Sequence, residues 1–107
     1  MTRRSIIYRT AEGTEPYVDY VDALRDRDGA ARIRARVTRA EAGNLGDHRS
    51  VGQGVVELKI DFGPGYRVYI GLEGSELIIL LTAGDKGGQK KDIQLAKKYW
   101  DDFRRHR

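Results

Sequence analysis

Residues 55–82, VVELKIDFGPGYRVYIGLEGSELIILLT, decide the fold, because three apolar segments follow one another there with two glycine-containing turns between them. This spacing predicts an antiparallel meander of three strands. In the first segment the apolar residues Val56, Leu58 and Ile60 alternate with charged ones, which predicts a sheet with one buried and one charged face. Residues 77–81 are apolar without alternation, so we expect that strand to be covered on both faces.

The chain outside this stretch is predicted to add one strand and three helices. Residues 5–10 favour a β-strand. Helical periodicity starts near Pro16, starts again after a cap at Asp28, and starts a third time at about Gln89. We therefore expect one α+β domain over residues 1–107, in the order β-α-α-β-β-β-α. It would have a mainly antiparallel four-stranded sheet, an N-terminal helical hairpin and a C-terminal helix.

A polar, glycine-rich segment at residues 45–54 joins the second helix to the meander, and we expect it to be a loop. It contains His48 and Arg49. An imidazole with a near-neutral pKa suits proton transfer, but a single histidine in a loop usually has no chemical role. His48 is therefore a reserve candidate only.

Four arginines lie outside the apolar stripe of the predicted second helix. They are Arg32, Arg34, Arg36 and Arg39. A solvated helix face accounts for them, since charged side chains normally cover the outer side of a surface helix. RNA binding is the alternative, because arginine pairs well with phosphate.

The composition is that of a globular domain with a heavily charged surface, since 39% of the 107 residues are hydrophobic and 34% are charged. Twenty Lys and Arg residues against 16 Asp and Glu give a net charge of +4, which mildly favours a polyanionic partner. The absence of cysteine excludes disulfides and thiolate metal sites, and we expect neither a metal nor a cofactor. No apolar run reaches about 20 residues, so we expect a cytoplasmic protein without a signal peptide or membrane span.

Two signals conflict about the register of the first hairpin in the meander. Pro64 and Gly65 fit the centre of a type II turn, which would place Gly63 opposite Tyr66. The hydrophobic pattern instead favours Phe62 opposite Tyr66, because this pairing keeps the apolar side chains on one face. We expect the pattern to decide, with a bulge at Gly65 that absorbs the extra residue.

In this register the charged face of the hairpin carries a patch of polar side chains. Its members are Glu57, Lys59, Asp61, Arg67 and Tyr69. Asp61 would lie opposite Arg67. Lys59 would lie opposite Tyr69, with Glu57 one step further along the same face. Spacing alone favours solvated ion pairs, each worth less than about 1 kcal/mol, over a site that carries chemistry.

Three segments carry a family resemblance: DALRDRDGAARIRAR at residues 22–36, GVVELKIDFGPGYRVYIG at 54–71 and LIILLTAGDKGGQKKDIQLAKKYW at 77–100. With its GPGYRVY and GDK motifs, the chain resembles the RelE/ParE superfamily of bacterial type II toxins, specifically the HigB-like addiction-module killer proteins. The resemblance covers nearly the whole chain. It implies a compact RelE-like fold and a toxin held inactive by a co-encoded antitoxin, usually a small helix-turn-helix protein. The two proteins would together bind their operator DNA.

In the RelE branch of this superfamily, the toxin is an mRNA interferase that cuts messenger RNA within the ribosome and so inhibits translation. The resemblance therefore implies an endoribonuclease whose partners are the ribosome and mRNA. Two other functions stay open. One is a ParE-like toxin that inhibits DNA gyrase without chemistry of its own, and the other is a degenerate toxin that acts mainly as a corepressor with its antitoxin. The cations and acids on one sheet face favour the nuclease.

The resemblance also implies roles for particular residues. Arg67 matches an arginine that contacts the reacting phosphate, Lys59 matches one of two lysines on the preceding strand, and Lys86 matches a basic residue after the last strand. Glu57 stands where the second lysine would be. Our hypothesis is that Glu57 or Lys59 acts as the base. Arg67 and Lys86 would then stabilise the phosphate. The remaining candidates bind RNA, by base stacking or by charge: Tyr69, Arg49, Lys90 and Lys91.

Overall fold

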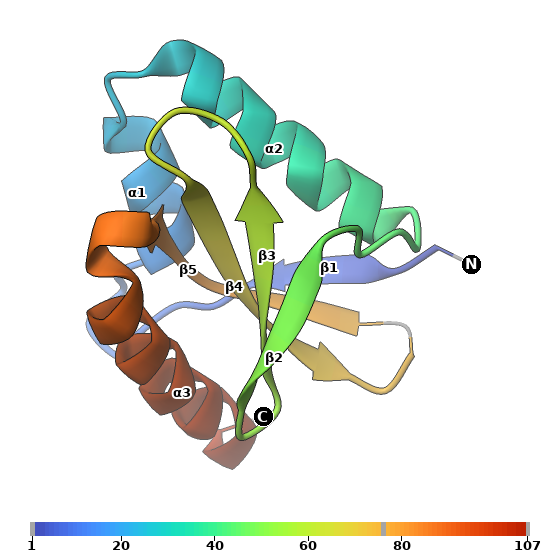
Figure 1. The fold of residues 1–107 in the computed structure, drawn as a ribbon. Helices are drawn as coiled ribbons and strands as arrows, with labels where there is room; N and C mark the ends of the chain where they lie inside the picture. The colour runs from blue at the N-terminus through green and yellow to red at the C-terminus, as the bar shows by residue number, and fades with distance from the viewer. Residues whose placement is uncertain (1, 76, 107) are drawn as a thin grey trace.

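The computed structural model describes residues 2–75 and 77–106, and in these residues one five-stranded sheet has helices on both faces (Figure 1). The strands are β1 (Arg4–Ile7), β2 (His48–Gly52), β3 (Val55–Ile60), β4 (Tyr66–Glu73) and β5 (Leu77–Asp85). The helices are α1 (Pro16–Ala23), α2 (Arg27–Glu41) and α3 (Gln89–Arg105). The strand order is β1-β5-β4-β3-β2, with β1 parallel to β5 and the other neighbours antiparallel. This confirms an α+β fold with the predicted three helices.

The predicted four-stranded sheet is wrong, because residues 45–54 are not a loop. They contain β2, which pairs antiparallel with β3 at the edge of the sheet. The chain turns through Gly52, Gln53 and Gly54, whose φ angles of 100°, 58° and 86° all lie in the left-handed region that glycine adopts readily. The order of elements along the chain is therefore β-α-α-β-β-β-β-α and not the predicted β-α-α-β-β-β-α.

The sheet divides two apolar cores. On one face, α1 packs over the strands through Tyr17 and Val21, and α2 packs through Ile33 and Val37, as the helical periodicity predicted. On the other face, α3 packs through Ala96 and Trp100. The prediction that residues 77–81 are covered on both faces is confirmed, since β5 contributes alternate side chains to the two cores.

The register of β3 and β4 differs by two residues from the predicted one. Ile60 lies opposite Tyr66, and Lys59 lies opposite Arg67. A shift of two residues keeps every side chain on its predicted face, so the predicted apolar face is confirmed while the predicted partners are wrong. Asp61 has left the strand and is exposed.

The connection between β3 and β4 explains this shift. The Gly65 N–H donates to the carbonyl of Phe62 over 3.1 Å, so Gly63 and Pro64 are the central residues of the turn. Neither the type II turn at Pro64 and Gly65 nor the bulge is therefore formed as predicted. Phe62 instead follows the end of β3 and lies next to α2, where the Arg32 guanidinium is 4.3 Å from its ring centroid.

Helix α2 begins two residues earlier than predicted, because Asp26 and not Asp28 is its N-cap. The Asp26 carboxylate accepts hydrogen bonds from the Gly29 N–H at 2.9 Å and from the Tyr66 hydroxyl at 2.7 Å. One side chain therefore caps the helix and ties it to the start of β4.

Arg36 is a second correction on α2, because it is buried and not on a solvated face. Its Nε donates to the Lys59 carbonyl at 3.0 Å, and its Nη2 donates to the carbonyls of Leu45 and Asp47, the latter at 2.8 Å. The guanidinium thus joins α2 to the segment before β2 and to the end of β3. The planar fork of arginine suits such carbonyl acceptors.

The first strand is Arg4–Ile7 and not residues 5–10, while Gln89 begins α3 as predicted. Among residues 2–75 and 77–106, no helix has both the length and the apolar character that crossing a membrane requires.

Candidate functional site

The centre of the candidate site is the carboxylate of Glu57, which is completely buried on the α3 side of the sheet. Its Oε1 accepts a 2.8 Å hydrogen bond from Nε of Arg49 on β2. Its Oε2 accepts hydrogen bonds from the Tyr69 hydroxyl at 3.0 Å and from Nε2 of Gln89 at 2.8 Å. The carboxylate therefore connects β2, β3, β4 and the first residue of α3.

These donors keep Glu57 ionised. Burial alone would raise the pKa of Glu57, but the hydrogen bonds from Arg49, Gln89 and Tyr69 outweigh it and hold the pKa below its usual range. A fully buried carboxylate whose two oxygens already accept hydrogen bonds offers no atom to a bound substrate. Our hypothesis assigned the role of base to Glu57 or Lys59, and the burial of Glu57 favours Lys59.

Tyr69 is likewise inaccessible. It lies opposite Glu57 across β3 and β4, and its ring is fully buried against α3. Burial, followed by the charge of Glu57, raises the pKa of the Tyr69 hydroxyl, so the hydroxyl stays protonated and donates to the carboxylate. The predicted stacking of Tyr69 on an RNA base is wrong, because stacking requires an exposed ring face.

Arg67 lies beside this buried group and is held by the chain around it. Its Nη1 donates to the carbonyls of Gly65 at 3.0 Å and Tyr66 at 3.3 Å. Its Nε lies 3.8 Å from Oε1 of Glu57 and has no hydrogen-bond acceptor within the described part of the chain. Only 12% of the Arg67 side chain is exposed, so a ligand would meet a guanidinium in a nearly fixed position.

Two lysines flank Arg67. Lys59 is directly opposite it on β3, and Lys86 is exposed in a short 3₁₀ helix, Lys86–Gly88, after β5. A Cβ atom placed on Gly65 would lie 3.3 Å from Nη1 of Arg67 and 3.4 Å from Cβ of Lys86, so these two residues stand on either side of Gly65. The resemblance-based set of Lys59, Arg67 and Lys86 is therefore brought together.

The turn that carries Lys86 is fixed by the residue before it. Oδ1 of Asp85 accepts hydrogen bonds from the backbone N–H groups of Gly87 at 2.9 Å and Gly88 at 3.3 Å. Asp85 and Gln89 are site residues that sequence reasoning missed. The Asp-x-Gly spacing was a usable signal for the turn, whereas nothing local indicates that Gln89 reaches Glu57.

The other predicted RNA contacts border the same site. Nε of Arg49 donates to Glu57, while half of the Arg49 side chain is exposed. Lys90 and Lys91 are exposed in the first turn of α3. His48 is not part of it, because it lies opposite Leu58 and therefore on the other sheet face. Several cations around one buried carboxylate leave an excess of positive charge, which suits a phosphate ligand.

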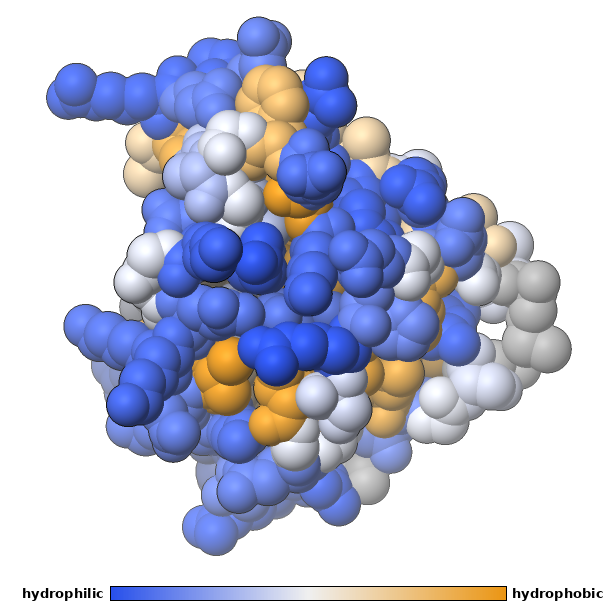
Figure 2. Space-filling model, viewed as in Figure 1, coloured by the Kyte–Doolittle hydropathy of each residue, from blue (hydrophilic) through white to orange (hydrophobic). Residues whose placement is uncertain are grey.

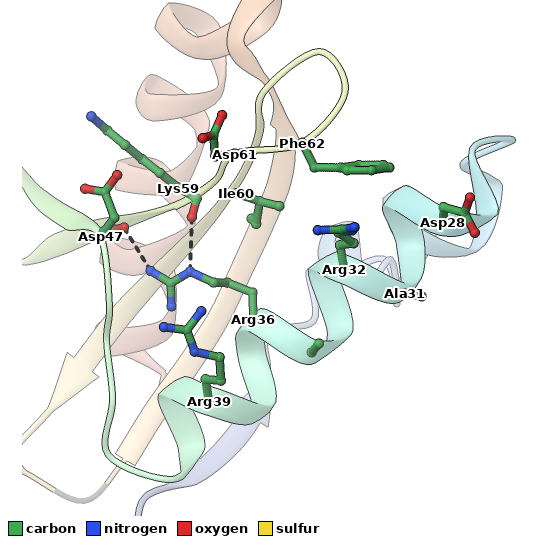
Figure 3. A pocket seen from close by; sticks show the side chains of 11 residues that line it. Asp28, Ala31, Arg32, Arg36, Arg39, Asp47, Lys59, Ile60, Asp61 and Phe62 are labelled. Atoms are coloured by element: carbon green, nitrogen blue, oxygen red, sulfur yellow. Dashed lines mark hydrogen bonds between the residues drawn. The ribbon is translucent and has the colours of Figure 1, made fainter.

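The outer surface is mostly hydrophilic, with apolar side chains in small separate patches in the view of Figure 2. One groove of about 790 Å³ lies between α2 and the end of β3 (Figure 3). Arg32, Arg36 and Arg39 line it from α2, and Lys59, Asp61 and Phe62 line it from the β3 side. Lys59 thus belongs to both the groove and the cluster around Glu57.

No family model matches the chain. A protein of Haemophilus influenzae, described as uncharacterized, is 44% identical to it over 84 residues. The aligned part covers 78% of this chain and 85% of the Haemophilus protein, so the similarity extends over most of both proteins.

Proposed function

The chain belongs to the same family as the Haemophilus influenzae protein, and we propose that it is the toxin of a type II toxin–antitoxin system. In this proposal it is a RelE-like endoribonuclease that cuts messenger RNA on the ribosome. The observation that supports the proposal is the gathering of Lys59, Arg67 and Lys86 at one end of the sheet. These residues come from three separate segments of the chain, and their types match those that the RelE resemblance implies.

The arrangement suits RNA cleavage by an internal attack. The ribose 2′-hydroxyl loses its proton to a base and its oxygen attacks phosphorus. The bond to the 5′-oxygen breaks, and that oxygen leaves with a proton from an acid or from water. Negative charge increases on the phosphate oxygens during this step. Arg67 offers a fixed guanidinium and Lys86 an exposed ammonium to that charge. Because such donors are already in place before the reaction, they stabilise the transition state without a large reorganisation.

Glu57 has a different role in this proposal from the one its sequence position suggested. It is a positioning residue that holds Arg49 and lies next to Arg67, and it does not take the proton from the 2′-hydroxyl. Lys59 then remains as the candidate group for that proton. It is only half-buried and lies directly opposite Arg67.

The proposal includes partners. An antitoxin, of the helix-turn-helix type that accompanies HigB-like toxins, would hold the toxin inactive and bind operator DNA with it. The ribosome and mRNA would be the targets in the cytoplasm. The basic surface around Arg49, Lys90 and Lys91 is available for either kind of partner.

The test is induction of the wild type and Arg67→Ala in cells, followed by mapping of transcript 5′ ends and of plasmid supercoiling. Cuts at codon-related positions that disappear in Arg67→Ala support the nuclease. Persistent toxicity of Arg67→Ala with intact transcripts and lost supercoiling contradicts it and points to gyrase. A wild type without toxicity points to a corepressor. Arg25→Ala, a change of an exposed arginine between α1 and α2, is the matched control.

A further inference from the structure

The groove between α2 and the end of β3 has the size and lining of a nucleotide site. Its volume of about 790 Å³ lies within the range of about 300–1,000 Å³ typical of small-ligand sites. Ala31 and Ala35 on α2 and Ile60 on β3 give it apolar walls, around which charged side chains are placed. Apolar walls with a few polar groups are typical of sites that take up a flat organic ring.

One side of the groove carries a stacked pair. The guanidinium of Arg32 lies 4.3 Å from the centroid of the Phe62 ring, and both side chains line the groove (Figure 3). Arg32 is exposed and Phe62 is half-buried, so the pair is accessible from solvent. Arginine planes and aromatic rings are the surfaces on which proteins stack unpaired bases.

On the α2 side of the groove, the guanidinium of the buried Arg36 lies close to that of the exposed Arg39. Figure 3 shows those of Arg36 and Arg39 side by side, and their repulsion adds to the effect of burial in lowering the pKa of Arg36. Arg36 is 5% exposed, and its Nη1 has no hydrogen-bond acceptor among residues 2–75 and 77–106. An anion that binds the exposed Arg39 guanidinium beside Arg36 would relieve this repulsion.

The groove and the proposed cleavage site share Lys59, which lines the groove and lies opposite Arg67. The groove is on the α2 side of the sheet and Arg67 faces the α3 side, so RNA that reaches both passes around the end of β3. We propose that the groove binds one nucleotide of the single-stranded RNA whose neighbouring phosphate lies at Arg67. Its base stacks on the Arg32 and Phe62 pair, and its phosphate lies at Arg36 and Arg39. This inference rests on the proposed function for its substrate.

Carboxylates in the groove limit what it can hold. Asp28, Asp47 and Asp61 line it together with four cations, so its excess of positive charge is small. A run of phosphates would meet these acids, whereas a single nucleotide meets cations at its phosphate and can present base amino groups to a carboxylate. The mixed lining therefore favours one nucleotide over a long stretch of backbone.

The experiment measures binding of the purified chain to a short single-stranded RNA with one 2-aminopurine, without ribosomes. Phe62→Leu removes the aromatic ring while keeping an apolar side chain, and Arg39→Gln removes one charge. Arg34→Gln is the matched control, since Arg34 is an exposed α2 arginine outside the groove lining that pairs with Asp22. Thermal unfolding checks that each variant is folded.

The wild type should bind the RNA and quench the 2-aminopurine. Phe62→Leu should bind about 10-fold more weakly, lose the quenching and keep the salt dependence, because only stacking is removed. Arg39→Gln should lower the slope of log affinity against log salt by about 0.7, as expected for one lost phosphate contact on a single strand. Arg34→Gln should behave as the wild type.

The proposal is overturned if Phe62→Leu and Arg39→Gln bind as the wild type does, or if Arg34→Gln weakens binding as much as Arg39→Gln. It is also overturned if the wild type binds no RNA at a protein concentration of about 10⁻⁴ M, where even nonspecific binding is normally seen. Normal RNA binding with lost antitoxin binding would make the groove a protein interface instead. If the groove variants weaken RNA binding but the wild type cleaves no mRNA on ribosomes, the proposed nuclease activity is contradicted and the proposed nucleotide site is supported. If the wild type cleaves mRNA on ribosomes but the groove variants bind RNA as the wild type does, only the proposed nucleotide site is contradicted.

Discussion

The Nε atom of Arg67 lies 3.8 Å from Oε1 of Glu57, a buried carboxylate oxygen that already accepts a 2.8 Å hydrogen bond from Arg49. One oxygen therefore lies next to guanidinium groups from two strands. Because Glu57 is not exposed, it acts on these arginines and not on a ligand. The contribution of Glu57 to stability can be measured separately from the contribution of Arg67 to cleavage.

Replacing Glu57 by Gln should lower the free energy of unfolding by about 2 kcal/mol at neutral pH, since it removes the charge that accepts hydrogen bonds from Arg49, Tyr69 and Gln89. The folded state lowers the pKa of Glu57 below its ordinary value of 4.5. Its stabilisation is therefore fully present above pH 4.5 and is lost as pH falls through the lower folded-state pKa. Urea unfolding at several pH values should show a smaller acid loss in Glu57→Gln than in the wild type. Equal losses would contradict this, with Glu12→Gln as the exposed control.

Asp85 should matter for cleavage through the position of Lys86. Asp85→Ala removes the acceptor for the N–H groups of Gly87 and Gly88, so the turn that carries Lys86 loosens. We expect the rate of single-turnover cleavage to fall about 10-fold in Asp85→Ala, because a charge-assisted hydrogen bond is lost. The rate should fall much less in Asp85→Asn, which keeps an acceptor oxygen. If Asn and Ala are equally defective, the carboxylate has a role beyond holding the turn.

Gly71 should not tolerate a side chain, because a Cβ there would lie 2.3 Å from the Trp100 ring. Gly71→Ala should lower the free energy of unfolding by about 1–3 kcal/mol through overpacking. Combining it with Trp100→Leu makes space at the same point. The double variant should therefore lose less stability than the sum of the two single changes, as a thermal unfolding cycle can measure. Simple additivity would show that the ring does not meet this strand.

Tyr66 reports on the contact between β4 and the start of α2. Burial, and then the hydrogen bond to Asp26, raise the pKa of Tyr66 to about 12. Its stabilising contribution should be present below pH 10 and should disappear as pH rises through about 12. Near-ultraviolet absorbance is measured as a function of pH for the wild type and for Tyr66→Phe. The difference between the two curves is the titration of Tyr66, separated from the rest of the six tyrosines. In Asp26→Asn its titration should move toward pH 10.0, and no movement would contradict the assigned contact.

The sheet faces were predictable because burial acts on every second residue of a strand. The exact partners were not, since a two-residue shift leaves the same apolar pattern. The register depends on contacts with a distant segment, namely Phe62 under Arg32 and Tyr66 on Asp26. A pattern within β3 and β4 contains no information about these contacts.

The charged face shows a related limit. Glu57 and Lys59 alternate with apolar neighbours in the same way, yet Glu57 is buried while Lys59 is half-exposed. Glu57 lies under the start of α3, whose first residue, Gln89, donates a hydrogen bond to it. Arg36 was misplaced for a similar reason, since carbonyls from outside its own helix make its burial possible. The alternation in β3 predicted that Glu57 and Lys59 share one face of the sheet, but the burial of Glu57 depends on the tertiary structure.

The most direct test of the proposed nuclease is single-turnover cleavage of a defined mRNA on isolated ribosomes by the wild type, Arg67→Ala and Arg25→Ala, with all three checked for folding. We predict cleavage by the wild type and Arg25→Ala at codon-related positions. Arg67→Ala should be at least about 100-fold slower, as when one transition-state donor is removed. Cleavage by Arg67→Ala at the wild-type rate, or no cleavage by the wild type, would contradict the account.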